Sequence, residues 1–377
     1  MVTVAVRYSV YRRSMVRVDR DRVMAYRVAA VGLARRVDDR PADLPLLDLG
    51  VQEYTPGSAQ VGLSARTSAD LTDDRLVAVW AARGAPHLHR RRELPGLAEA
   101  LWPVSDADAS ARIKSGQIPD GMKLGLEAFR VTAEAMSKIV TRSIPRGEAS
   151  TAVSAMVPKS LTYDCRTCAA RHIAGNVWQH ASFAGGVLVE SRGKDATLGP
   201  IPRWAGVPRE NRGIDRLIHL YLRMLGPATP AEVAKYFGSS TAEIKKVWPG
   251  DLAEVTVDGR KRWLPADAVD ELAGAGPVRG VRLIPPMDAL LQARDRDVLV
   301  PAREQQKEVW RTLGNPGALL VNGEIAGVWR AKMAGRKRVD LTVTPFRSLR
   351  PADRKAVETE AAEVARARQV PDVTVTF

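Results

Sequence analysis

Cysteine is nearly absent from this 377-residue sequence, which contains only Cys165 and Cys168. Two cysteines this close in sequence cannot cross-link distant parts of a large fold, so a stabilising framework of disulfide bonds is excluded. Apolar runs of about 18 residues, long enough to span a membrane, are also missing. The start, MVTVAVRYSVYRRSM, is basic and lacks the apolar core of a signal peptide. We therefore expect a cytoplasmic protein, without membrane contact, whose N-terminus is flexible over residues 1–18.

Familiar catalytic signatures are missing too. The sequence contains no glycine-rich phosphate loop, no HExxH motif and no Ser-His-Asp signature. These absences argue against nucleotide-driven and HExxH-type metal-dependent chemistry. We expect no cofactor and no metal.

Basic residues are abundant. Lys and Arg total 57 against 43 Asp and Glu, which gives a net charge of +14 and a pI of about 10.1. Because basic side chains near phosphates release counterions, this excess indicates a polyanionic partner. The alternative is an arginine-rich composition without functional meaning. We expect a nucleic acid as the partner, and a nucleoid-associated location.

The clearest folding unit covers residues 210–272. Its first helix is predicted from apolar residues at helical spacing in GIDRLIHLYLRML. A second follows in PAEVAKYFG, with Thr229 as N-cap and Gly238 as stop. A third, in SSTAEIKKVW, precedes two strands around Asp258-Gly259, a hairpin signal. Three helices followed by a hairpin predict a winged helix.

The same order recurs, more weakly, in two earlier segments. In residues 120–205 we expect helices over 122–140, in PRGEASTAVSAMV and in CRTCAARHIAGNVWQHASF, then a hairpin around Arg192-Gly193. In residues 19–110 we expect helices over 19–33, in TPGSAQVGLSAR and in DDRLVAVWAA, with a strand-like return in RGAPHLHRR. Three tandem winged helices supply several DNA contacts in one chain, so we expect a monomer.

Residues 278–377 show another pattern. GALLVNGEIAGVWRAKMAGRKRVDLTVTPF alternates apolar and polar residues around Asn322-Gly323 and Gly335, which predicts an antiparallel meander. ADRKAVETEAAEVARAR predicts a closing amphipathic helix and DVTVTF a last strand. The predicted class is α+β.

Several stretches together resemble the AlkZ-like DNA glycosylase family. They are GVQEYTPGSA (50–59), RGAPHLHRR (83–91), CRTCAARH (165–172), DALLQARDRDVLVP (288–301) and KEVWRTLGNPGALLVNGEIAGVWR (307–330). The resemblance spans nearly the whole chain after about residue 20. It implies three tandem winged-helix domains followed by a C-terminal β-barrel-like domain, arranged as a C around a basic channel for duplex DNA.

The resemblance also implies an activity, the excision of N-alkylated bases, including bulky adducts and crosslinks. In that family a Gln-x-Gln motif of the first module carries the reaction. Here Gln52 matches the first glutamine, and Tyr54 stands in place of the second. We take Gln52, Tyr54 and the intervening Glu53 as candidate catalytic residues. The departure at Tyr54 is compatible with an altered substrate or with lost glycosylase activity.

Such chemistry asks little of the protein, because an alkylated purine is cationic and leaves readily. What remains is to stabilise an oxocarbenium-like sugar and to place a water on its far face. A glutamine amide serves both tasks through its carbonyl and its NH2 group. Glu53 is a candidate base, and the Tyr54 hydroxyl could hold water. The alternative for Gln52 is a packing role in the loop before Pro56.

Candidate DNA contacts come from four basic stretches. Their residues are His87, His89, Arg90 and Arg91 in the first module; Lys245 and Lys246 on the expected recognition helix; Arg260, Lys261 and Arg262 on its hairpin; and Arg330, Lys332, Arg336, Lys337 and Arg338 on the C-terminal meander. Basic hairpins and helices suit backbone contacts. Solvated turns, and histidines buried in a core, are the alternatives.

Cys165, Cys168, His172 and His180 are spaced like ligands of a structural metal site. Core packing of the two cysteines fits the pattern equally well, and we prefer it. Two functions remain from these observations. We favour a DNA-repair glycosylase over the alternative, a non-catalytic winged-helix protein such as a regulator or lesion-binding factor.

Overall fold

The computed structural model describes residues 16–167, 169–193 and 195–377. The expectation of a flexible N-terminus lies outside the described residues except at its end, where β1 (Arg17–Val18) pairs in parallel with β10 (Leu252–Val257). Helix α1 (Arg20–Ala30) begins at Asp19, whose side chain accepts from the backbone of Arg22. It packs against α8, α11 and α12 and so joins the start of the chain to residues 210–300.

The rest of residues 19–110 forms a small three-stranded sheet with helices around it. Its strands lie in the order β2-β4-β3. The elements are β2 (Val51–Gln52), α2 (Ser58–Ser64), β3 (Leu76–Trp80), β4 (Pro86–Arg90), α3 (Leu94–Leu101) and α4 (Asp106–Arg112). The helix expected in DDRLVAVWAA is therefore wrong. Val77 and Val79 favour an extended chain, and β4 supplies the hydrogen-bonding partner.

Residues 120–205 form a separate lobe with its own core, built around Phe129, Met136 and Trp178. Its elements are α5 (Leu126–Ile139), β5 (Ile144–Pro145), α6 (Arg146–Met156), β6 (Thr162–Cys165), β7 (Ala170–Ile173), α7 (Gly175–Ala181), β8 (Val187–Val189) and β9 (Thr197–Pro200). The single long helix expected in CRTCAARHIAGNVWQHASF is wrong, because its first half pairs as the β6–β7 hairpin and α7 begins only at Gly175. The predicted β8–β9 hairpin is confirmed.

Residues 210–272 contain the predicted elements in the predicted order. They are α8 (Ile214–Leu225), α9 (Pro230–Phe237), α10 (Thr241–Lys246), β10 and β11 (Arg260–Pro265). A further helix that was not predicted, α11 (Val269–Gly274), follows them. Thr229 and Glu232 form a capping box at the start of α9, and Gly238 ends that helix in a left-handed conformation. Local chemistry specifies these boundaries. That this unit and the two before it are winged helices stays a prediction.

The C-terminal part is an open five-stranded sheet, or half-barrel, in the order β12-β13-β14-β15-β16. The elements are β12 (Val281–Ile284), α12 (Arg296–Leu299), α13 (Arg303–Val309), β13 (Gly317–Val321), β14 (Glu324–Ala334), β15 (Arg338–Pro345), α14 (Pro351–Ala367) and β16 (Asp372–Thr376). The predicted meander, closing helix and last strand are confirmed. Helix α14 covers the sheet and also packs against α2, which ties the half-barrel to the first sheet.

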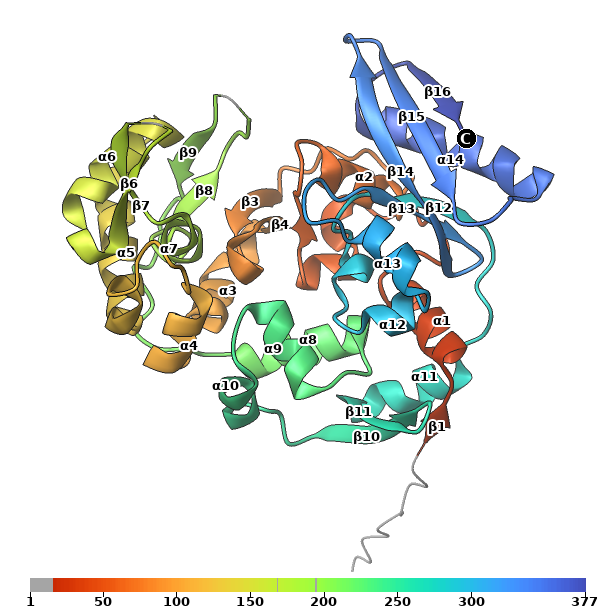
Figure 1. The fold of residues 1–377 in the computed structure, drawn as a ribbon, viewed down its shortest axis with the longest axis horizontal. Helices are drawn as coiled ribbons and strands as arrows, with labels where there is room; N and C mark the ends of the chain where they lie inside the picture. Colours follow the sequence, from red (N-terminus) through yellow and green to blue (C-terminus); the bar gives the residue numbers. More distant parts are fainter. Residues whose placement is uncertain (1–15, 168, 194) are drawn as a thin grey trace, which may run out of the picture.

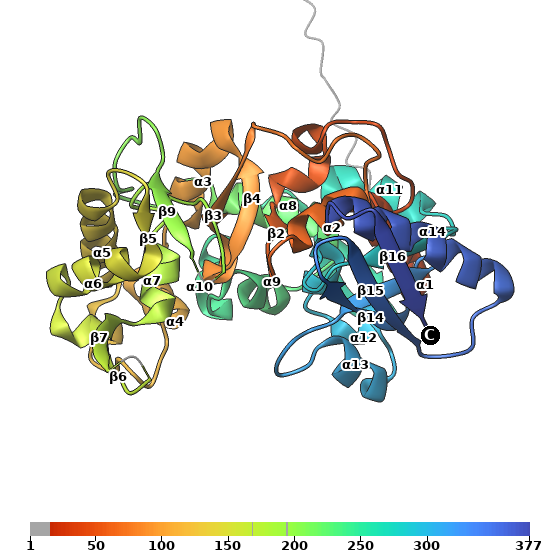
Figure 2. The ribbon, with the colours of Figure 1, turned by 90° about the horizontal axis from the view of Figure 1, so that it is seen from above.

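The lobes lie along an arc around a hollow. Figure 1 shows the lobe of α5–α7 and the half-barrel of β12–β16 on opposite sides of an opening, with β3 and β4 between them. The view from above keeps the same separation, with the β2-β4-β3 sheet in the middle (Figure 2). Across the described ranges, no helix is long and apolar enough to cross a membrane.

Candidate functional site

The segment that contains Gln52 lies at the edge of the first sheet. Strand β2 pairs with β4, so that Gln52 faces His87 in the ladder. Gly50 directly precedes the strand with φ +80°, and a Cβ at this position would overlap the ring of His89. The tight turn over His89 thus requires glycine, and it delivers Gln52 to the centre of the molecule with only 8% of its surface exposed.

The side chain of Gln52 is held by an arginine that the sequence did not single out. Arg83 Nη2 donates to Gln52 Oε1 at 3.1 Å and to Gln292 Oε1 at 2.6 Å. Arg83 Nη1 donates to the carbonyl of Tyr236 at 2.7 Å, and its guanidinium lies 4.7 Å from the centre of that tyrosine's ring. One guanidinium therefore gathers the first sheet, helix α9 and the segment before α12 around Gln52.

This contact fixes the orientation of the Gln52 amide. A guanidinium carries donors only, so the atom facing Arg83 must be the amide oxygen. The NH2 group of Gln52 then points away from Arg83, and it donates to no side chain or carbonyl in the described ranges. Gln292 uses both ends of its amide, because its Nε2 donates to the carbonyl of Met287 at 2.8 Å. The NH2 group of Gln52, in contrast, has no partner within the described residues.

Positive charge accumulates beside Gln52 without a carboxylate to neutralise it. Burial lowers the pKa of Arg83 to about 10, and the nearby charge of Arg294 adds to the effect. Burial also lowers the pKa of Arg294 and of Arg296, which stacks 4.8 Å from the ring centre of Trp310. Within the described residues these three guanidiniums form no ion pair. Arg83 and Arg294 are at least half-buried without a carboxylate partner, whereas Arg296 is exposed, so this region offers positive charge to an anion.

Arginines elsewhere in the interior behave differently. Arg27 pairs with Asp295 at 2.7 Å, Arg66 with Asp288 at 2.9 Å and Arg112 with Asp108 at 2.7 Å. Each of these buried cations is neutralised, as is usual for a charge removed from water. Arg83 and Arg294 differ from these three arginines in having no carboxylate partner within the described residues.

Tyr54 contacts the C-terminal part of the chain. Its hydroxyl accepts a hydrogen bond from the backbone nitrogen of Asn315 at 3.4 Å. Asn315 Nδ2 contacts the sulfur of Met287 at 3.7 Å, while its Oδ1 is buried and unpartnered within the described residues. Arg330 Nη2 holds the preceding carbonyl, that of Gly314, at 2.9 Å. The tyrosine hydroxyl keeps its own proton free to donate.

The side chain of Glu53 is directed to the start of helix α2. Its carboxylate accepts from the backbone nitrogens of Gly57 at 2.6 Å and Ala59 at 2.7 Å, at the start of α2. Carboxylates at helix N-termini satisfy free amides and the helix dipole. Arg192 of the β8–β9 loop donates to the Glu53 carbonyl, and Arg368 donates to the carbonyl of Pro56. Glu53 thus shapes the segment, with both carboxylate oxygens occupied.

Four of the candidate DNA contacts are buried. His87 is 0% and His89 2% exposed, and burial keeps the pKa of His87 well below its usual value and lowers that of His89 to about 3. Arg90 is enclosed by Asp48 and Glu93. Arg262 bonds Glu232 and Asp295. Because these side chains are enclosed, they cannot touch phosphate in this conformation, and their positions correct that expectation.

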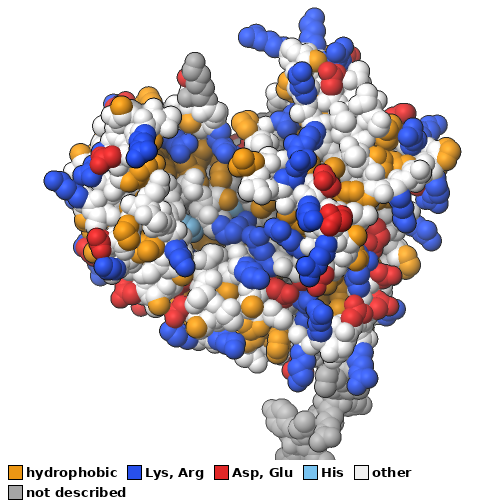
Figure 3. All heavy atoms as spheres, in the orientation of Figure 1, with side chains coloured by type: hydrophobic (Ala, Val, Ile, Leu, Met, Phe, Trp, Pro, Cys, Tyr) orange, Lys and Arg blue, Asp and Glu red, His pale blue; other side chains and the backbone are white. Residues whose placement is uncertain are grey.

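The remaining candidates are on the surface. They are Arg91, Lys245, Lys246, Arg260, Lys261, Arg330, Lys332, Arg336, Lys337 and Arg338. Figure 3 shows Lys and Arg side chains gathered over the hollow between the lobes and on the tip of the half-barrel. The hollow therefore offers a basic surface to a polyanion.

Among the described residues, the cysteine and histidine candidates form no metal centre. The described residues contain no group of three or more His, Cys, Asp or Glu side chains placed to hold an ion. Cys168 lies outside the described residues. Cys165 ends β6, His172 lies on β7, and His180 lies on α7 beside the ring of Phe129.

Comparison with known proteins places the chain in a family. Residues 46–367 match the family model described as DNA glycosylase AlkZ-like. The interstrand DNA cross-link repair glycosylase of Streptomyces sahachiroi is 34% identical over 180 residues, which are 46% of this chain and 47% of that protein. The match thus spans about half the length of that relative.

A solved structure shares the fold. The DNA glycosylase AlkZ of Streptomyces sahachiroi superposes with a TM-score of 0.73 at 24% identity, covering 96% of this chain and 100% of the other. On the extent of the family match, this chain belongs to the AlkZ-like DNA glycosylase family.

Proposed function

We propose that this protein is a monofunctional DNA glycosylase that hydrolyses the N-glycosidic bond of alkylated or bulky-adduct bases in duplex DNA. The observation that carries the proposal is the Gln52 amide, oriented by Arg83 beside arginines that lack carboxylate partners. Family membership supports it, as does the name of the curated relative, a glycosylase of interstrand cross-link repair. No cofactor enters the reaction.

The proposed reaction is a hydrolysis at the anomeric carbon of the damaged nucleotide. The bond to the base breaks with its electron pair going to the base, whose positive charge is thereby neutralised. A water adds to the sugar and loses a proton to solvent. The protein's share is to place that water and to stabilise the sugar cation, through preorganised dipoles in a site of low dielectric constant.

We assign the two side chains different roles. The NH2 group of Gln52 donates to the attacking water or to the adjacent phosphate, while the second lone pair of its oxygen faces the developing positive charge. The Tyr54 hydroxyl, fixed by Asn315, donates to the same water. Glu53 is a positioning residue, because its carboxylate holds the start of α2.

The surrounding charges would hold the DNA backbone. Arg83, Arg294 and Arg296 would meet phosphates near the lesion, and the exposed basic side chains of α10, the β10–β11 hairpin and the β14–β15 hairpin would meet them farther out. We keep the three winged-helix units, a monomer and a nucleoid-associated location as parts of this proposal.

A non-catalytic lesion-binding protein is the second candidate, and one observation favours it. Tyr54 stands where the family has its second glutamine, and a phenol carries its donor and its acceptor on one oxygen, whereas an amide carries them on two separate atoms. Binding would then persist through the same arginines without cleavage of the glycosidic bond.

The test is an excision assay on purified protein. Duplex DNA containing 7-methylguanine or a bulky N-alkyl adduct is incubated with the protein, and abasic sites are then cleaved with alkali. We expect lesion-dependent cleavage that is lost in Gln52→Ala, reduced in Tyr54→Phe and largely retained in Glu53→Gln. Tight binding without abasic product across a broad lesion panel would establish the second candidate instead.

A further inference from the structure

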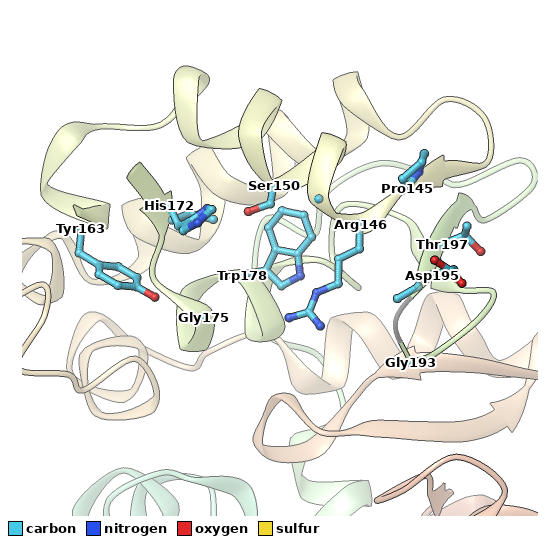
Figure 4. A pocket seen from close by; sticks show the side chains of 13 residues that line it. Pro145, Arg146, Ser150, Tyr163, His172, Gly175, Trp178, Gly193, Asp195 and Thr197 are labelled. Atoms are coloured by element: carbon cyan, nitrogen blue, oxygen red, sulfur yellow. The ribbon is translucent and has the colours of Figure 1, made fainter. Parts of the chain in front are cut away.

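A second cavity lies in the lobe of residues 120–205. Its volume is 570 Å³, and it opens between the start of α6, the β6–β7 hairpin, α7 and the β8–β9 loop (Figure 4). Tyr163 and His172 line one end, Trp178 and Arg146 the middle, and Asp195 with Thr197 the other end. It is separate from the Gln52 site and large enough for one drug-sized ligand.

Two buried polar atoms at this cavity lack partners. Trp178 is 3% exposed, and its indole Nε1 forms no hydrogen bond within the described residues. Nε2 of His172 is likewise buried and unpartnered there. A buried N–H without an acceptor costs free energy, and native proteins rarely leave one without a reason. An acceptor supplied by a ligand would remove the cost.

The side chain of Arg146 covers the indole N–H of Trp178, and a movement of this side chain would expose it. Figure 4 shows its side chain lying along the nitrogen-bearing edge of Trp178. The arginine is exposed and forms no ion pair with the described residues. A ligand whose anionic group draws this flexible side chain toward itself would open the indole N–H to the ligand's ring atoms. The only carboxylate among the lining residues, Asp195, lies at the far end beside Thr197.

These features favour a ligand that has a flat ring with hydrogen-bond acceptors and an attached anionic group. Trp178 and Tyr163 offer aromatic surface, His172 and Ser150 offer hydrogen bonds, and Arg146 offers a positive charge. A nucleotide satisfies all of them at once. A purely apolar ligand would leave Arg146 and the indole N–H unmatched.

The cavity also lies next to the Gln52 site. Residues 193 and 195–197 of the β8–β9 loop line it, and Arg192 of the same loop donates to the carbonyl of Glu53. The charge of Arg146 acts on Arg192, so the two arginines are neighbours. A DNA strand bound at Gln52 would therefore lie close to the β8–β9 loop, which lines the opening of the cavity.

We propose that this cavity binds a single nucleotide displaced from a DNA strand, with its base against Trp178 and His172 and its phosphate on Arg146. The inference rests on the proposed function for the source of the nucleotide, the duplex opened at a lesion. The cavity's preference for a nucleotide does not depend on catalysis.

The first experiment uses a free nucleotide and the full-length protein. Binding of 2′-deoxyadenosine 5′-monophosphate is measured by equilibrium dialysis for the wild type, Arg146→Gln and Trp178→Phe. The matched control is Arg142→Gln, an arginine four residues earlier whose side chain is 74% exposed and lies outside the lining. We expect the Kd to rise at least tenfold in both cavity variants and to stay unchanged in the control. Deoxyadenosine, which has no phosphate, should respond to Trp178→Phe alone.

The second experiment uses DNA. A duplex with 2-aminopurine beside the lesion should gain fluorescence on binding the wild type, and less on binding Arg146→Gln. Equal nucleotide binding by Arg146→Gln and Arg142→Gln, or no binding at millimolar nucleotide, overturns the proposal. Should Trp178→Phe fail to fold, the Arg146→Gln variant still tests the proposal, because Arg146 is exposed and its replacement should not disturb the core. Gln52→Ala keeps the two proposals distinguishable, because it should abolish excision and leave nucleotide binding intact.

Discussion

Arg83 donates to the side-chain oxygen of Gln52 at 3.1 Å, and this bond determines which end of the amide faces the hollow. Arg83 itself has φ +59°, a left-handed conformation unusual for a side chain of its size. Three hydrogen bonds, to Gln52, Gln292 and the carbonyl of Tyr236, hold it there. The strain is localised at the residue that orients the proposed catalytic amide.

Replacing Arg83 should therefore impair excision more than binding. Loss of a hydrogen bond to a charged donor costs about 1.5–3 kcal/mol, which is roughly ten- to hundredfold in rate if the bond orients the amide in the transition state. Arg83→Lys keeps the charge but cannot bridge two glutamines, so it should lose most of the excision rate as well. Single-turnover excision and DNA affinity would be measured in parallel. An Arg83→Lys variant with full excision would contradict the positioning role.

The sequence predicted much of the fold where local signals were strong. The Asp258-Gly259 hairpin, the N-cap at Thr229 and the Asn322-Gly323 meander are local and lie where expected. Residues 76–80 form a strand in place of the predicted helix. A short apolar run fits either element, and only its pairing with β4, the strand that follows, decides between them.

The site was predicted only in part, for a similar reason. Gln52 came from a motif, whereas its contact with Arg83, and that of Tyr54 with Asn315, arise only through the tertiary fold. Arg83 and Gln292 were inside stretches that carried the family resemblance, and nothing in their spacing tied them to Gln52. Burial of Arg90 and Arg262 was equally invisible, because their carboxylate partners come from elsewhere in the fold.

Gly50→Ala should distort the segment before Gln52. The added methyl group would overlap the ring of His89, and the φ of +80° disfavours any side chain. We expect a loss of about 1–3 kcal/mol in the free energy of unfolding, together with reduced excision. Urea denaturation measures the first effect. Gly96→Ala, at a position with open space around it, is the control and should be nearly neutral.

Asp295→Ala should be among the most destabilising substitutions in the interior of the protein. Its carboxylate bonds Arg27 and Arg262, and both guanidiniums are buried. Arg262 keeps Glu232 as a partner, whereas Arg27 is left as an unpaired buried charge, which costs about 3–5 kcal/mol. A drop of that size in denaturant unfolding is expected, against almost none for Asp297→Ala, whose side chain is 68% exposed. A small effect at Asp295 would mean that water reaches the arginines.

DNA binding should weaken steeply with salt, and the basic β14–β15 hairpin should contribute to the slope. Lys332, Arg336 and Lys337 are exposed on it, and each phosphate contact contributes about one counterion to the slope of log K against log salt. Lys337→Gln should lower the slope by roughly one if it touches DNA. Arg130→Gln, on α5 and already paired with Glu127 and Glu134, should leave it unchanged. Fluorescence anisotropy over a salt range of roughly 50 to 300 mM measures the slope for both variants.

Stability should fall as the pH drops below about 6.5, the ordinary pKa of histidine. His87 and His89 are buried and their pKa values are depressed, that of His89 to about 3, so the unfolded state binds more protons than the folded state below pH 6.5. Their contribution to stability is complete above that pH and is lost progressively toward pH 3. At pH 5 the lowered pKa of His89 should cost roughly 2 kcal/mol relative to pH 7.5, in a range where most carboxylates are still ionised. Urea unfolding at the two pH values tests this. His180 is also buried with its pKa lowered to about 3, so His89→Gln should remove only its own share of the dependence, and an unchanged profile would contradict the assignment.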